Sequence, residues 1–188
     1  MWRFATALCV MAPLAADAQT LRIGLLGQDM GTTDPHRAAA SQDKGPLSWA
    51  HDGLLRFPTG SADPARIEPD LAERVERSPD GLTYTFRLRS GVRFHDGSAL
   101  EAEDVAFSLR RAADASRSAF SGDYASVTNI DIVDPLTVRV TLREAAAGAE
   151  GLFANYHGGL IVSRRADAGG FQAGTGPFRL ERAAGGQA

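Results

Sequence analysis

The segment at residues 78–88 constrains the fold most strongly. It opens with Ser78-Pro79-Asp80-Gly81, a run of residues that favour a tight turn. Every second residue from Leu82 to Leu88 is then leucine or aromatic, which is the period of a strand with one buried face. A register shift of one residue would turn these aromatic side chains to water. We therefore predict a β-hairpin whose second strand has one apolar face.

The remaining segments predict a mixture of strands and helices. Alternating or short apolar runs predict strands at 20–26, 92–94, 128–133, 136–142, 160–162 and 178–182. Apolar spacing and alanine-rich composition predict helices over 38–57, 102–113 and 145–156. Strands and helices do not alternate regularly and the sequence has no internal repeat, so the fold class is predicted to be α+β.

The clearest helix signal lies at residues 102–113. Its apolar residues recur at i, i+3, i+4 and i+7, and acidic residues fill the first turn, where the helix dipole favours negative charge. Glu101 stands at the capping position in place of Ser, Thr, Asp or Asn. We therefore expect the start of this helix to be up to about 1 kcal/mol weaker than a capped one.

Residues 1–18 are typical of an export signal. A basic residue precedes the apolar stretch 4–16, and Ala16-Asp17-Ala18 matches the small-x-small pattern before a cleavage site. The stretch is shorter than the roughly 20 apolar residues that span a bilayer. Cys9 is the only cysteine, and lipidation there is disfavoured because Leu8 precedes it where a small residue is expected. We predict a mature periplasmic chain of about 170 residues without disulfides.

Charge and motifs exclude several classes of function. The net charge of −3 gives no electrostatic attraction for nucleic acid. Lys44 is the only lysine, and the excess of arginine indicates codon bias more than phosphate recognition. The four histidines have no i, i+4 partner and no cysteine neighbour, so no metal site is predicted. Neither a Gly-x-Ser-x-Gly motif nor a phosphate-binding loop occurs, so no catalytic residue and no cofactor are predicted.

Several stretches carry a longer and more specific pattern. They are DGLTYTFRLR at 80–89, GVRFHDG at 91–97 and EDVAFSL at 103–109, with shorter matches DPH at 34–36, DGLL at 52–55 and GTGPF at 174–178. Together they resemble the peptide/nickel family, family 5, of extracellular solute-binding proteins of ABC importers. The matching stretches are spread over nearly the whole mature chain.

The resemblance implies a fold like that of the type II periplasmic binding proteins, in which two lobes close on a solute. On that pattern, residues 19–42 begin domain I, residues 43–163 form domain II, and residues 164–188 return to domain I. It also implies a monomeric, non-enzymatic receptor that delivers its solute to an ABC permease in the inner membrane. An oligopeptide is the expected solute, and a nickel complex or an oligosaccharide is left open.

The residues expected to face the solute lie in loops. They are Ala39, Ala40 and Ser41 after the first strand, Phe120, Tyr124, Tyr156 and His157, and the loop of Gly174, Thr175 and Gly176. Aromatic rings can clamp a solute at low entropic cost, and glycine-rich backbone can approach it closely. The alternative is that the aromatic side chains only pack inside the protein and the glycines only turn the chain.

Members of the family are longer than this chain, so we expect it to be an N-terminal part that lacks the second lobe. Two other interpretations stay open. The chain is a truncated remnant without a function of its own, which would expose apolar surface where the missing lobe docks. Or it is an exported hydrolase, which the absence of a nucleophile motif disfavours.

Overall fold

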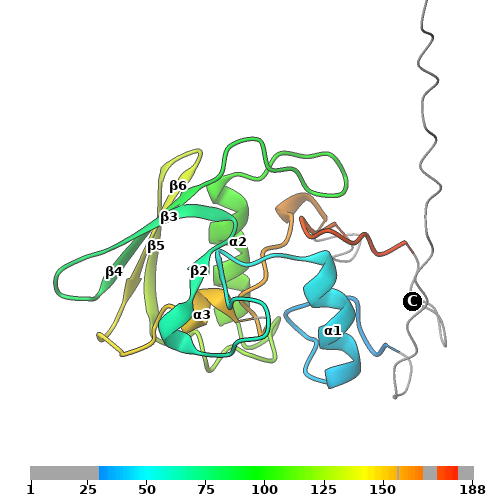
Figure 1. Ribbon diagram of the computed structural model, residues 1–188, viewed down its shortest axis with the longest axis horizontal. Helices are drawn as coiled ribbons and strands as arrows, with labels where there is room; N and C mark the ends of the chain where they lie inside the picture. Colours follow the sequence, from blue (N-terminus) through cyan, green and yellow to red (C-terminus); the bar gives the residue numbers. More distant parts are fainter. Residues whose placement is uncertain (1–29, 156, 167–172, 182–188) are drawn as a thin grey trace, which may run out of the picture.

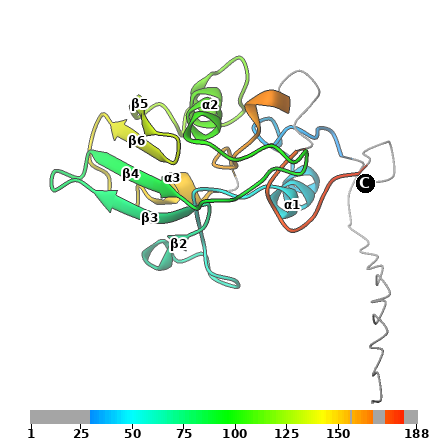
Figure 2. The ribbon, with the colours of Figure 1, turned by 90° about the horizontal axis from the view of Figure 1, so that it is seen from above.

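An antiparallel sheet covered by helices on one face dominates the architecture, and a separate helix lies beside it (Figures 1 and 2). The computed structural model describes residues 30–155, 157–166 and 173–181. The predicted export signal at 1–18 and the predicted strand at 20–26 lie outside the described residues.

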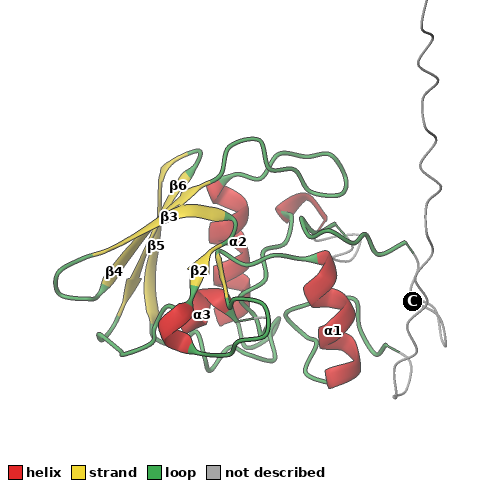
Figure 3. Cartoon of the chain, viewed as in Figure 1, coloured by secondary structure: helices red, strands yellow, loops and turns green. Residues whose placement is uncertain are grey.

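The helices and strands follow one another in an irregular order, which confirms the α+β class (Figure 3). In chain order they are α1 (Ser41–Ala50), β1 (Leu55–Arg56), the 3-10 turn η1 (Pro64–Arg66), β2 (Glu68–Pro69), β3 (Ala72–Arg77), β4 (Thr83–Leu88), α2 (Ala102–Ala113), β5 (Val127–Asp134), β6 (Thr137–Leu142), α3 (Gly151–Ala154) and the 3-10 turn η2 (Arg164–Ala166). None of the helices in the described ranges is long and apolar enough to cross a bilayer.

The main sheet has the strand order β3-β4-β6-β5, and both predicted hairpins are confirmed. In the first, Val75 pairs with Phe86, and the Ser78 amide donates to the Thr83 carbonyl at 2.9 Å across the turn. Gly81 takes a φ of 72°, a left-handed conformation that explains glycine at this position. The turn residues therefore set the register that the alternation requires.

The core lies between one face of this sheet and α2 with α3. Tyr84, Phe86 and Leu88 of β4 are each at most 1% exposed, as the alternation predicts. Phe153 of α3 packs edge-on against Phe86 with ring centroids 4.7 Å apart. Val105 of α2 belongs to the same buried cluster. The opposite face of the sheet presents polar residues such as Arg87 and Arg139, which are exposed.

The predicted bounds of α2 are confirmed, and the weaker start expected from Glu101 at the cap stays a prediction. The Glu101 amide donates to the Asp104 carboxylate at 3.1 Å, and the Asp104 amide donates to the Glu101 main-chain oxygen at 2.9 Å. This reciprocal arrangement supplies a partner for the Glu101 amide without Ser or Thr at the cap. The sequence rule considered the side chain of Glu101 alone and did not include this contact of its amide.

Ion pairs fasten both ends of α2 to distant parts of the chain. Near its C-terminal end, the Arg111 guanidinium donates to both oxygens of Asp34, at 3.1 and 2.6 Å. At its N-terminal end, Arg164 contacts the carboxylates of Glu101, Glu103 and Asp104 at 2.6 to 2.8 Å. Thus the segment before α1 and the segment at η2 are both held by one helix.

The helix predicted over 38–57 is shorter, since α1 spans only Ser41–Ala50. The His51 amide makes the last helical bond, to Leu47, and His51 itself is extended with ψ 144°. Leu54 and Leu55 are at most 2% exposed and belong to the main core, and Leu55 pairs with β2. Burial of these two leucines in extended backbone outweighs their helical spacing.

Four other predicted segments differ from the structure. The helix predicted over 145–156 is only α3, because Gly148 takes a φ of 77° and turns the chain. Residues 92–94 and 160–162 form only single bridges, Arg93 with Ala99 and Leu160 with Gly53, although 160–162 is buried as expected. Residues 178–181 form no strand: this segment lies along α1 and has no strand partner in the part of the chain that the structure describes.

Candidate functional site

The predicted solute-facing residues gather at the two ends of α1. Phe120 and His157 lie near its first turns, where Lys44 reaches them. Residues 174–176 cross its last turn, where their backbone bonds to Ala50 (Figure 1). The resemblance predicted these residues as one set, whereas the structure separates them into two groups with different neighbours.

Phe120 and His157 form a stacked pair of rings. Their centroids are 5.6 Å apart and the ring planes differ by 15°. Gly158 follows with a φ of 86°, and a β-carbon there would lie 3.0 to 3.1 Å from Tyr124 and Phe120. Only glycine therefore lets the chain pass this close to the aromatic side chains.

Tyr124 lies inside this cluster and is 0% exposed. Its hydroxyl donates to the Leu152 carbonyl at 2.9 Å, which supplies the partner that a buried phenol needs. Burial is the main cause that raises the pKa of Tyr124. Tyr124 is therefore a buried packing residue, and its own surface is not open to a solute.

Lys44 approaches the ring pair from α1. Its Nζ lies 2.9 Å from His157 Nε2 and 5.6 Å from the centroid of the Phe120 ring. Burial and, next, the positive charge of Lys44 lower the pKa of His157. A neutral imidazole is thus favoured, and it accepts the hydrogen bond that the ammonium donates.

The glycine loop is held against the other end of α1. The Gly176 amide donates to the Ala50 carbonyl at 3.1 Å, and the Thr175 hydroxyl donates to the Asp52 carboxylate at 2.9 Å. The His95 amide donates to the Gly174 carbonyl and its Nε2 donates to the Gly176 carbonyl, both at 2.8 Å. This loop is therefore tied to α1 and to the turn at residues 95–97.

The other predicted residues belong to neither of these two groups. Ala39 and Ser41 are exposed at the start of α1, and Ala40 caps it without a side-chain hydrogen bond. Tyr156 lies outside the described residues. The structure thus brings Phe120, Tyr124 and His157 together, and it holds residues 174–176 as a separate group.

Sequence reasoning missed three residues that organise these groups, namely Lys44, Asp52 and His95. Asp52 and His95 stand inside family-like stretches, so the motif was a signal for them even though their partners were not predictable. Lys44 is 113 positions from His157, and its only signal was that it is the sole lysine.

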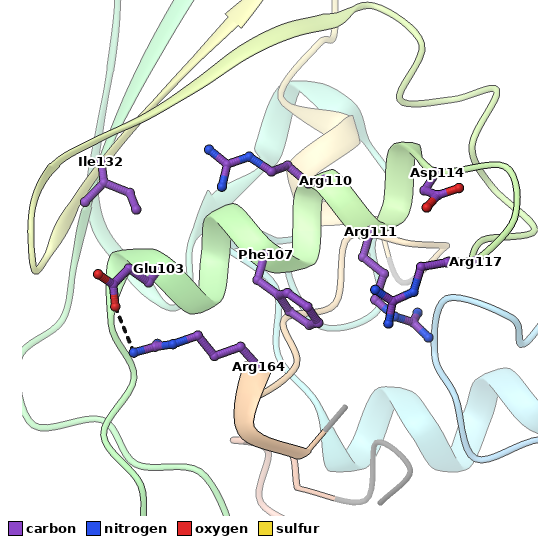
Figure 4. Close-up of a pocket in the computed structure, with 8 residues that line it drawn as sticks. All are labelled: Glu103, Phe107, Arg110, Arg111, Asp114, Arg117, Ile132 and Arg164. Atoms are coloured by element: carbon purple, nitrogen blue, oxygen red, sulfur yellow. Dashed lines mark ion pairs between the residues drawn. The ribbon is translucent and has the colours of Figure 1, made fainter. Parts of the chain in front are cut away.

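A separate hollow of about 400 Å³ lies on the outer side of α2 (Figure 4). It is lined by Glu103, Phe107, Arg110, Arg111, Asp114, Arg117, Ile132 and Arg164, and by none of the predicted solute-facing residues. Its arginines already have partners: Arg110 donates to the Ile130 carbonyl at 2.8 Å, and Arg117 lies over the Phe107 ring. This hollow is therefore built from the ion-pair network that surrounds α2.

A metal centre was not predicted. Among the described residues, no group of three His, Cys, Asp or Glu side chains could hold a metal ion.

Comparison with known proteins relates most of the chain to binding proteins. A family model described as "Bacterial extracellular solute-binding proteins, family 5 Middle" matches residues 66–188. The glutathione-binding protein GsiB of Salmonella paratyphi A is 30% identical over 162 residues, which cover 83% of this chain and 31% of GsiB.

Two solved structures share the fold at higher coverage of this chain. MoaA from A. tumefaciens R10, in complex with mannopinic acid, is 40% identical with a TM-score of 0.81, over 85% of this chain and 34% of MoaA. DppA from Helicobacter pylori, in complex with the peptide STSA, is 27% identical with a TM-score of 0.74, over 85% of this chain and 36% of DppA. The chain therefore spans about a third of the length of these relatives.

Proposed function

Because the chain belongs to family 5 of the bacterial extracellular solute-binding proteins, we propose that it serves an ABC importer by capturing a peptide or peptide-like solute in the periplasm. The observation that carries this proposal is the shared fold with MoaA, at a TM-score of 0.81 and 40% identity. The proposed role is binding without chemistry, and the inner-membrane permease is the proposed partner of a monomeric receptor.

The surroundings of α1 support this role. One end of the helix carries an aromatic pair with a cation, and the other end is crossed by a glycine loop. Rings can pack on apolar parts of a solute, while the glycine loop, whose Gly176 amide and Gly174 and Gly176 carbonyls already bond within the chain, supports the last turn of α1. We propose that the solute lies along this side of α1.

The solutes named for the relatives narrow the chemical class. Glutathione, the peptide STSA and mannopinic acid are all small polar molecules that carry carboxylate and nitrogen groups. We therefore propose a carboxylate-bearing amino-acid derivative or short peptide as the solute, ahead of an oligosaccharide or a nickel complex.

We further propose the domain division expected above, with residues 43–163 as domain II between two segments of domain I. The main buried cluster supports it, because its members run from Leu54 to Ile161. Leu47 and Ala50 of α1 are buried but lie outside that cluster, so the cluster supports the division from Leu54 onward and does not bear on the boundary at residue 43.

Isothermal titration calorimetry on the purified chain tests the function. The peptide STSA, glutathione, mannopinic acid and a neutral trisaccharide are titrated separately, beside a longer in-frame version where the gene provides one. Saturable heat with at least one of the first three solutes, and none with the trisaccharide, is expected.

Heat with none of the carboxylate-bearing solutes in either version would reject the proposal. Binding by the longer version alone would favour the remnant interpretation for the 188-residue chain. A parallel screen with esterase and peptidase substrates should show no turnover, and turnover abolished by a point substitution would favour the hydrolase alternative.

A further inference from the structure

Lys44 differs from the basic side chains around α2 in what surrounds it. Arg111 and Arg164 are matched by carboxylates at 2.6 to 2.8 Å. Lys44 has no such ion pair within the described ranges, and its contacts are the neutral imidazole of His157 and the Phe120 ring. A half-buried positive charge thus lies beside the proposed solute surface with no carboxylate within 4 Å among the described residues, although the Asp123 carboxylate is close enough to raise the pKa of the neighbouring His157.

The ammonium group also has donors to spare. It carries three N–H donors, and the contact with His157 uses one of them. A carboxylate can accept two or more hydrogen bonds, and a charged donor strengthens each of them. The chemistry at this point therefore matches an anion with several acceptor atoms.

The two rings keep the lysine in place. Lysine is a flexible side chain, and holding it costs conformational entropy when it binds a ligand. Here the hydrogen bond to His157 and the cation–π contact with Phe120 hold the ammonium before any ligand arrives. The cost of ordering Lys44 is then met during folding, which favours binding.

We infer that Lys44 anchors a carboxylate group of the solute, with the Phe120–His157 ring pair beside it. This inference rests on the proposed function and adds the group of the solute that is recognised and the residue that recognises it. The same contacts would also arise if Lys44 only tied α1 to the loop at residue 157, so the test must depend on the charge of the ligand.

The first test compares two forms of one peptide. The peptide STSA is titrated with a free C-terminal carboxylate and with a C-terminal amide, by calorimetry on the full chain. The free acid should bind about tenfold to a hundredfold more tightly, as expected for a hydrogen bond to a charged group. In Lys44→Gln, which removes the positive charge and keeps a shorter polar side chain, this preference should fall to within about threefold.

Two further variants serve as controls. Lys44→Arg keeps the positive charge and should keep the preference for the free acid. Arg139→Gln removes one exposed positive charge from β6, far from α1 in the chain, and should leave the preference unchanged. A preference that survives Lys44→Gln, or that is lost equally in Arg139→Gln, would overturn the inference.

A second test does not depend on peptide binding. Glutarate and its neutral diamide are titrated while the His157 ring resonances are followed by NMR. Glutarate should shift these resonances in the unaltered chain and not in Lys44→Gln, and the diamide should shift neither. Glutarate shifts without any STSA binding would reject the peptide function but support the carboxylate site. STSA binding without a Lys44-dependent effect in either test would reject the carboxylate site alone.

Discussion

His36 provides the sharpest test of the packing around α2 and the bridge at Leu160. Its ring is 0% exposed, and its Nε2 donates to the Leu160 carbonyl at 3.0 Å. Its Nδ1 has no hydrogen-bond partner among the described residues, so a second ring proton would be buried without an acceptor. Burial lowers the pKa of His36 to about 4, helped by the nearby charge of Arg111, while the hydrogen bond to Leu160 and the carboxylate of Asp34 oppose the shift.

The sign of the effect follows from the two pKa values. The unfolded chain takes up a proton near the ordinary pKa of 6.5, whereas the folded chain resists it down to about 4. Acidification therefore favours the unfolded state between these two values. At pH 4 the difference amounts to about 3 kcal/mol of lost folding free energy, since one pKa unit corresponds to about 1.4 kcal/mol.

The assay is urea denaturation followed by circular dichroism at several values between pH 7 and pH 4. His36→Gln serves as the reference because glutamine keeps an amide donor and does not titrate in this range. The difference in unfolding free energy between the unaltered chain and His36→Gln should change by about 3 kcal/mol across the range. Taking this difference cancels the contribution of the carboxylates, which titrate in both proteins, to the unfolding free energy.

NMR titration of the His36 ring gives a direct check. A pKa above about 6, or a pH-dependent difference below about 1 kcal/mol, would refute the conclusion that His36 is buried and neutral in the folded chain.

Two other predictions concern Asp70, which lies near Asp52, and Gly174, which lies against the last residue of α1. Burial and the nearby carboxylate of Asp52 raise the pKa of Asp70 to about 6, so the folded state binds this proton more tightly than the unfolded state and stability falls as pH rises from about 4 to 6. Asp70→Asn should remove this slope and raise the unfolding free energy at pH 7 by about 2 kcal/mol, because solvent screening of the partly exposed carboxylate reduces the roughly 3 kcal/mol of the full pKa shift. Urea denaturation measures it, and an unchanged slope would contradict it. At Gly174, a β-carbon would lie 1.8 Å from the Ala50 carbonyl oxygen, so Gly174→Ala should lower the unfolding free energy by about 1 to 3 kcal/mol. Gly122→Ala, where a β-carbon would have no atom within 4 Å, should leave it unchanged. Equal losses in the two variants would show that the glycine loop does not pack closely against α1.

The elements that could be predicted are those with local causes. The hairpin of β3 and β4 depends on a turn sequence and on the alternation that follows it, and α2 depends on one apolar stripe. Both signals lie within a few residues of the element that they specify. The same holds for β5 and β6, which the Asp134-Pro135 turn joins.

Two of the wrong predictions have distant causes. Leu54 and Leu55 have helical spacing, but their place in the core with β4 and α3 requires extended backbone. Residues 178–181 alternate like a strand, yet the Phe178 amide bonds to the Trp49 carbonyl of α1. Periodicity within the segment contains no information about either partner.

The candidate site shows the same division. Phe120, Tyr124 and His157 could be proposed from the resemblance and the chemistry of aromatic rings. Their grouping with Lys44 depends on how α1 packs against the loops at 120 and 157, which nothing in the local sequence specifies.

The fastening of both ends of α2 has a mechanical consequence. A helix of 12 residues is about 18 Å long, and Asp34 and Arg164 grip it at opposite ends. If the sheet rotates relative to α1, the segment before α1 and the segment at η2 must move together, because both are bound to the same rigid helix α2. Removing the ion pairs at either end of α2 should therefore let one connecting segment move without the other.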